Sequence, residues 1–231
     1  MSKFNLPLEY LVRNPEVDHS DGMPPMLILA HGLRSNEYDL FSLVPFLDER
    51  FIVISVRAPI VMGAGQYAWY RVEFHADRIE HDTEDVARAT MWLADFIDQA
   101  VKAYGADPKR VYLMGFSQGA MVSLALLFAQ PEMLAGVVCM SGSLPNDVLG
   151  KMDDTHKFDG FPMMVVHGTH DAVISIAEAR SVRKYLLQLN TQLDYREYPM
   201  SHQISDESLD DVCGWLIKQL NVANSIKPVA E

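Results

Sequence analysis

Cysteine is scarce in this chain. Cys139 and Cys213 are the only 2 cysteines in 231 residues, and both lie inside apolar stretches. A disulfide framework uses several cysteines, and a cysteine zinc site uses pairs at C-x-x-C spacing. Neither pattern is present, so we expect two buried free thiols and no cysteine-bound metal.

Long apolar runs and basic segments are also missing. No run approaches the roughly 18 apolar residues that span a bilayer. Residues 1–7 contain no basic stretch followed by an apolar core, so no secretory signal is visible. We therefore expect a cytoplasmic protein without stable insertion into a membrane.

Positive charge is in deficit. The chain has 19 Lys and Arg residues against 31 Asp and Glu residues, which gives a formal net charge of −12 at pH 7. The phosphates of nucleic acids and of anionic membranes repel such a chain. We expect no nucleic-acid partner.

Internal repeats and low-complexity tracts are absent as well. The 49% hydrophobic and 22% charged content is ordinary for a globular protein. A length of 231 residues suits one large domain with a substantial core. We predict a single domain over residues 1–231, with residues 222–231 as a frayed tail. The oligomeric state stays open, and a homodimer is one option.

What the chain does contain is an alternation of strand and helix patterns. Short apolar or alternating runs predict strands at 8–13, 26–30, 51–56, 110–114, 134–140, 163–166 and 193–198. Helical periodicity predicts helices at 38–47, between Asp82 and Gly105, from 120 to a stop at Pro131, after a Ser175/Glu178 capping box, and at 209–220. Residues 60–81 show no strong periodicity. The alternation predicts an α/β fold with a mainly parallel sheet and helices on both faces.

One pentapeptide suggests chemistry. Gly115-Phe116-Ser117-Gln118-Gly119 lies between a predicted strand and a predicted helix. Strand, G-x-S-x-G and helix together form a nucleophile elbow, in which a sharp turn exposes the serine hydroxyl and the glycines avoid collisions with neighbouring backbone. We therefore predict that Ser117 is a nucleophile.

A serine nucleophile needs a base and an acid. In elbow proteins these follow the serine in the order acid, then histidine. The chain has 8 histidines, but only His202 lies after Asp171, which itself directly follows a predicted strand. We predict a Ser117–Asp171–His202 triad. The alternatives are a surface histidine and an aspartate that merely shapes a turn.

The reaction also needs hydrogen-bond donors for an oxyanion. Backbone N–H groups supply them, one from the residue after the nucleophile and one from the loop after an early strand. These positions are Gln118 and Leu33. His31, in the same loop, is predicted to brace the backbone and not to transfer protons.

Six ordered blocks carry a resemblance to a known family: His31-Gly32-Leu33, Arg57-Ala58-Pro59, Tyr67-Ala68-Trp69-Tyr70, Gly115-Phe116-Ser117-Gln118-Gly119-Ala120, His167-Gly168-Thr169-His170-Asp171 and Ser201-His202. Together they resemble the phospholipase/carboxylesterase family of α/β-hydrolases, which includes acyl-protein thioesterases. The resemblance covers nearly the whole chain and implies the same triad and oxyanion donors. Arg34 and Ser201 stand where glycine is common in the family.

The leading hypothesis is a cofactor-free serine hydrolase that cleaves small-molecule carboxylic esters through an acyl-enzyme, with thioesters and lysophospholipids as further candidate substrates. We hypothesise that Trp69 or Tyr70 lines the acyl pocket, with core packing as the alternative. The short segment between residues 140 and 163 predicts that no large cap domain covers the site.

Two rival functions remain. Because His167, His170 and Asp171 crowd one strand end, they could bind a metal together with His202. The spacing lacks the i, i+4 helical pattern of zincins and leaves Ser117 without a role, and a chelator would distinguish the two enzymes. The second rival is a non-catalytic binding protein that has kept the fold.

Overall fold

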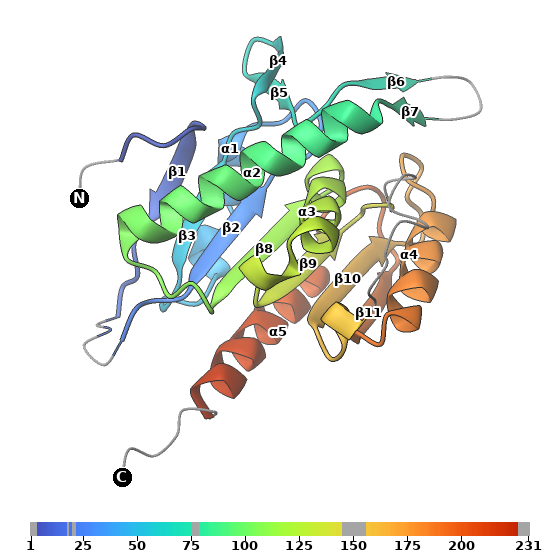
Figure 1. Cartoon of the computed structure of the whole chain (residues 1–231). Helices are drawn as coiled ribbons and strands as arrows, with labels where there is room; N and C mark the ends of the chain where they lie inside the picture. Colours follow the sequence, from blue (N-terminus) through green and yellow to red (C-terminus); the bar gives the residue numbers. More distant parts are fainter. Residues whose placement is uncertain (1–3, 18, 20–21, 75–78, 145–155, 226–231) are drawn as a thin grey trace.

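A mainly parallel sheet forms the centre of the computed structural model, which describes residues 4–17, 19, 22–74, 79–144 and 156–225. The sheet has 7 strands in the order β1-β3-β2-β8-β9-β10-β11 (Figure 1). The strands are β1 (Tyr10–Arg13), β2 (Met26–Ala30), β3 (Ile52–Val56), β8 (Val111–Phe116), β9 (Gly136–Met140), β10 (Pro162–Gly168) and β11 (Gln192–Tyr198). Only β1 is antiparallel to its neighbour within this sheet. The predicted sheet is confirmed.

Helices cover both faces of the sheet (Figure 1). They are α1 (Glu37–Phe41), α2 (Thr83–Tyr104), α3 (Gln118–Ala129), α4 (Ile176–Gln188) and α5 (Asp206–Ser225). One core cluster includes Leu93, Val122 and Val182 from α2, α3 and α4, and the other includes Leu40 and Val212 from α1 and α5. Burial from both sides explains why the inner strands β2, β3 and β9 have almost continuously apolar sequences.

The long helix α2 agrees with its predicted ends. The Asp82 side chain accepts a hydrogen bond from the Glu84 backbone N–H at 2.7 Å, which is an N-cap. Gly105 adopts a left-handed conformation with φ of 63° at the C-cap, where a side chain would be strained.

Three local predictions are wrong. The helix expected at 38–47 is interrupted: α1 ends at Phe41, and a 3₁₀ turn covers Val44–Phe46. Pro45 lies in that turn and lacks the N–H that a continuing α-helix needs. Ser175 is the N-cap of α4, but its side chain makes no capping bond.

The third error concerns residues 60–81, which contain two antiparallel strand pairs. The pairs are β4 (Ile60–Gly63) with β5 (Gln66–Ala68), and β6 (Val72–Phe74) with β7 (Ile79–His81). Strands of 3 or 4 residues are too short to show an alternating pattern, and β4 is mostly exposed.

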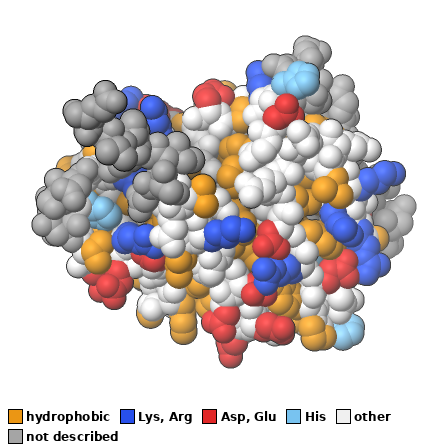
Figure 2. Space-filling view, turned by 90° about the horizontal axis from the view of Figure 1, so that it is seen from below, with side chains coloured by type: hydrophobic (Ala, Val, Ile, Leu, Met, Phe, Trp, Pro, Cys, Tyr) orange, Lys and Arg blue, Asp and Glu red, His pale blue; other side chains and the backbone are white. Residues whose placement is uncertain are grey.

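The described surface carries charged side chains of both signs (Figure 2), and one of the two cysteines is buried as expected. On the face shown in Figure 2, apolar side chains are interspersed with charged side chains of both signs. Cys139 is a buried free thiol, whereas Cys213 is only half-buried; burial raises the pKa of the Cys213 thiol to about 11. None of the helices in the described part of the chain combines the length and apolar character that a bilayer crossing requires.

Candidate active site

Ser117 occupies a strained turn between β8 and α3. Its backbone has φ of 54° and ψ of −118°, which non-glycine residues rarely adopt. A Cβ atom added at Gly119 would lie 1.9 Å from the Ala30 carbonyl oxygen, and one added at Gly115 would lie 2.3 Å from the Gly119 carbonyl oxygen. Any side chain at either glycine would therefore force the turn apart.

The structure brings Ser117, His202 and Asp171 together. The Ser117 Oγ lies 3.0 Å from His202 Nε2, and His202 Nδ1 lies 2.7 Å from Asp171 Oδ2. Asp171 follows β10 and His202 follows β11, so these two side chains approach Ser117 from neighbouring strand ends. The Asp171 side chain is fully buried, whereas the His202 side chain is 17% exposed.

The loops that carry the acid and the histidine pack closely. A Cβ added at Gly168 would lie 2.2 Å from the Met200 carbonyl oxygen, so only glycine permits this approach. The His170 backbone N–H donates to the same Met200 oxygen at 3.1 Å. This contact holds the loop before His202 against the loop that presents Asp171.

Asp171 is held on both of its oxygens. Its Oδ1 accepts hydrogen bonds from the backbone N–H groups of Val173 at 2.8 Å and Ile174 at 2.9 Å. Its Oδ2 faces both His202 and His167 Nε2, the latter at 3.3 Å. Asp171 therefore shapes a turn, as the alternative interpretation held, and also contacts the histidine.

Two residues at the site were missed as supports by the sequence analysis. The fully buried His167 places Nε2 2.8 Å from the Ile174 carbonyl oxygen and so buttresses the turn around Asp171. The Phe116 ring packs against the His202 ring, with centroids 4.9 Å apart. The sequence places His167 at a strand end and Phe116 inside the elbow, but neither position indicates which residue the side chain contacts.

The loop of Leu33 lies directly against the serine. A Cβ added at Gly32 would be 3.3 Å from Ser117 Cβ. The Arg34 backbone N–H donates to the Tyr67 carbonyl oxygen at 2.8 Å, which fixes the loop on β5. Arg34 has φ of 60°, a left-handed conformation that glycine adopts freely and in which arginine is strained. The loop therefore presents its backbone beside Ser117, where an oxyanion donor is needed.

Gln118 contributes more than its backbone. Its side-chain oxygen accepts from the Trp69 backbone N–H at 2.9 Å, and its side-chain nitrogen donates to the Tyr70 carbonyl oxygen at 2.8 Å. The Trp69 ring N–H donates to the His31 carbonyl oxygen at 2.9 Å. Trp69 and Tyr70 are both 0% exposed. This burial favours core packing over the acyl-pocket hypothesis for both rings.

An ion pair between the partly exposed Arg57 and the buried Glu37 supports the same region. Arg57 donates two hydrogen bonds to the Glu37 carboxylate, one of them at 2.7 Å, and its guanidinium lies 4.7 Å from the centre of the Tyr67 ring. Burial acts to raise the pKa of Glu37, but the hydrogen bonds and charge of Arg57 lower it overall. The pair ties α1 to the residue after β3.

His31 braces the loop of Leu33 as a neutral ring. Its Nδ1 lies 2.7 Å from the Gly32 carbonyl oxygen, and its Nε2 accepts from the Ala58 backbone N–H at 3.0 Å. Accepting at Nε2 requires the proton on Nδ1, which then donates to Gly32. Burial lowers the pKa of His31. A second proton would face the Ala58 N–H, so the folded protein resists protonation here.

This geometry predicts a loss of stability in mild acid. The unfolded chain binds a proton at His31 near the ordinary histidine pKa of about 6.5, whereas the folded chain binds it only at lower pH. The contribution of the neutral His31 ring to the free energy of unfolding is therefore complete above that pH. It falls as the pH drops toward the folded pKa, by at most about 1.4 kcal/mol per pH unit. Urea unfolding at a series of pH values measures the fall. A His31 ring that titrates in NMR like a solvent-exposed histidine would contradict this prediction.

The residues of the metal hypothesis do not assemble into a ligand set. Within the parts of the chain that the structure describes, no group of three or more His, Cys, Asp or Glu side chains could hold a metal ion. His170 is exposed, and His167 is bonded to the Ile174 carbonyl oxygen. The cluster at this strand end is a hydrogen-bonded network around Asp171.

Comparisons with known proteins identify the family. A model of the phospholipase/carboxylesterase family matches residues 14–220, so the chain belongs to this family and is a hydrolase with the α/β-hydrolase fold. It is 27% identical over 213 residues to acyl-protein thioesterase 1 of Schizosaccharomyces pombe, covering 87% of this chain and 92% of that protein. It is 26% identical to carboxylesterase SOBER1 of Arabidopsis thaliana over 168 residues, covering 71% and 72%.

Among solved structures, the Bacillus cereus carboxylesterase superposes with a TM-score of 0.80 at 26% identity, covering 93% of this chain and 96% of that one. The resemblance drawn from the six sequence blocks is confirmed at the level of family and fold.

Proposed function

We propose that this protein hydrolyses carboxylic esters through an acyl-enzyme formed on Ser117. The observation that carries the proposal is the continuous hydrogen-bonded series from Ser117 Oγ through His202 to Asp171 Oδ2. Family membership supports hydrolysis of esters as the reaction class.

Each residue then has a defined task. His202 Nε2 takes the proton of Ser117 as the oxygen attacks the ester carbonyl, and returns it to the leaving alcohol. The Asp171 carboxylate holds the proton on Nδ1, so that Nε2 is free to act as the base. The backbone N–H groups of Leu33 and Gln118 stabilise the oxyanion. A water molecule, deprotonated by His202, then attacks the acyl-enzyme, and Ser117 regains its proton as the acid is released.

The substrate class remains to be chosen between esters and thioesters. The relatives include both a carboxylesterase and an acyl-protein thioesterase by name. We propose an ester substrate as the first choice because the family model that matches residues 14–220 describes phospholipases and carboxylesterases, which cleave carboxylic esters. Rates on p-nitrophenyl esters of increasing chain length, measured beside palmitoyl thioesters, decide between them.

A serine-directed phosphonate tests the mechanism itself. The probe should modify Ser117 and none of the other serines, as read by peptide mass spectrometry, and activity should fall in proportion to labelling. Full activity after complete labelling, or labelling at another serine, would contradict the proposal. Activity abolished by a chelator and restored by a metal would favour the rival metal enzyme.

We predict that the enzyme needs no lipid interface. The short segment between residues 140 and 163 leaves little chain for a cap, and the His202 side chain is 17% exposed. The rate on p-nitrophenyl butyrate should therefore rise hyperbolically with concentration, with no jump when micelles form or detergent is added. A sharp interfacial jump would reveal a lid.

A further inference from the structure

The sheet ends at the edge strand β11, which has no strand partner on its outer side among the described residues. β11 pairs with β10 on one side and with no other described strand. The Gln192 N–H donates to Phe161, and the Tyr198 carbonyl accepts from Thr169, so even-numbered residues of β11 turn their backbone groups toward β10. Because direction alternates along a strand, the groups of Tyr195 and Glu197 face outward.

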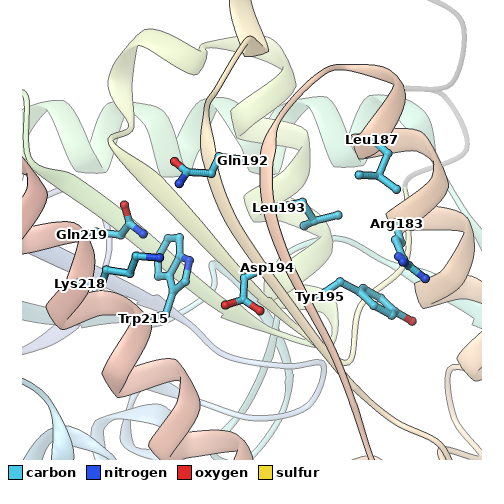
Figure 3. Close-up of a pocket in the computed structure, with 9 residues that line it drawn as sticks. All are labelled: Arg183, Leu187, Gln192, Leu193, Asp194, Tyr195, Trp215, Lys218 and Gln219. Carbon is cyan, nitrogen blue, oxygen red and sulfur yellow. The ribbon is translucent and has the colours of Figure 1, made fainter.

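A hollow of about 440 Å³ runs along both sides of this edge (Figure 3). Arg183 and Leu187 of α4 border it on one face of the sheet, and Trp215 and Lys218 of α5 border it on the other. Leu187 is 56% exposed, although it is a large apolar side chain. The helices therefore leave room beside β11 for an added strand.

We propose that the occupant is β11 of a second copy of this chain, paired antiparallel around a two-fold axis at Tyr195. In this register the Tyr195 backbone groups of the two copies bond each other. The Glu197 N–H donates to the carbonyl of Leu193 of the partner subunit, and the reciprocal bond forms by symmetry. Two seven-stranded sheets would thus become one continuous sheet, with the helices of both copies on the same faces.

Charge complementarity selects this register. Asp194 lies opposite Arg196 of the partner subunit, and Arg196 lies opposite the partner's Asp194. Shifting the axis to Asp194 or to Arg196 would place two carboxylates or two guanidinium groups face to face, which is destabilising. Within one chain Arg196 pairs with Asp194 at 3.0 Å and with Asp211 of α5 at 2.5 Å, and the Asp194 and Arg196 side chains remain 35% and 40% exposed at the edge.

This complementarity also favours a second copy over an unrelated peptide. The segment Leu193-Asp194-Tyr195-Arg196-Glu197 is its own partner under the two-fold axis, with opposite charges at both positions that flank the centre. A foreign strand would have to supply the same order of charges. The site at Ser117 lies elsewhere in the sheet, so pairing does not depend on the hydrolase proposal.

A charge-swap experiment tests the pairing. Asp194→Arg places arginine opposite arginine in its own homodimer, and Arg196→Asp places aspartate opposite aspartate. Sedimentation velocity should show a wild-type dimer at micromolar concentration and a dissociation constant raised about tenfold or more in each variant, because two attractive pairs become repulsive. An equimolar mixture of the two variants restores both opposite-charge pairs and should dimerise again.

The mixture separates pairing from folding. A variant that is merely destabilised cannot be rescued by another variant in trans, and esterase activity and circular dichroism of each variant should match the wild type. The proposal is overturned by a monomeric wild-type protein, by variants that dimerise as well as wild type, or by a mixture that stays monomeric.

Discussion

Replacing Ser117 with alanine should abolish ester hydrolysis while leaving the protein folded. The substitution removes the oxygen that His202 Nε2 contacts at 3.0 Å and hence the atom that would form the acyl-enzyme. Loss of the nucleophile in a serine triad lowers kcat on the order of 10⁶-fold, with only binding and oxyanion stabilisation left. The measurement is kcat with p-nitrophenyl butyrate, together with urea unfolding of the same preparation.

Ser117→Gly is the matched control for the strain at this turn. Glycine adopts the observed φ of 54° without cost, whereas alanine remains strained there. We expect the glycine variant to be as inactive as the alanine variant and at least as stable. An alanine variant that retained more than about 1% of wild-type kcat, or that failed to fold, would contradict the assignment of Ser117 as nucleophile in a preformed turn.

Asp171→Asn should lower kcat on the order of 10⁴-fold, as measured for the equivalent change in a serine triad. The two backbone N–H groups of Val173 and Ile174 bind Oδ1, so the amide oxygen of asparagine will take that place. The amide nitrogen then points to His202 Nδ1 and to His167 Nε2. His202 must accept at Nδ1, which puts its proton on Nε2, and it can no longer take the proton of Ser117.

The control is the same change at Asp98, whose carboxylate pairs with Lys102 on the exposed face of α2. Asp98→Asn should leave kcat unchanged, because surface pairs of this kind contribute little. The Asp171→Asn variant should keep KM close to the wild-type value, since the lost function is proton transfer and not binding. A loss smaller than tenfold would show that Asp171 serves only to shape its turn.

The order of residues along the chain was sufficient to propose the triad. An elbow serine, an aspartate after a later strand and a single histidine beyond it left few combinations, and the structure places these three within hydrogen-bond distance. Strand ends meet at one edge of a parallel sheet, so a position at a strand end already implies proximity. The same reasoning also suggested a metal site at one strand end, but the proximity of residues does not determine which of their atoms face each other.

The sequence could not decide the role of Trp69. An aromatic cluster in an aperiodic segment fits a substrate pocket and a core equally well. The structure shows Trp69 fully buried, with its ring bonded to the His31 carbonyl and its backbone bonded to the Gln118 side chain. Those partners lie 38 and 49 residues away, so no local pattern could identify them.

The sequence by itself determined the alternation of strands and helices, the elbow and the order along the chain of the three residues proposed as a triad. These features are local, because hydrophobic periodicity, capping residues and glycine spacing act within a few residues. Only the tertiary structure decided that His167 supports the turn of Asp171, that Phe116 packs on His202 and that β11 has an open edge. Such contacts depend on which strands lie side by side in the sheet. Packing between two distant elements produces no periodic pattern in the sequence of either element.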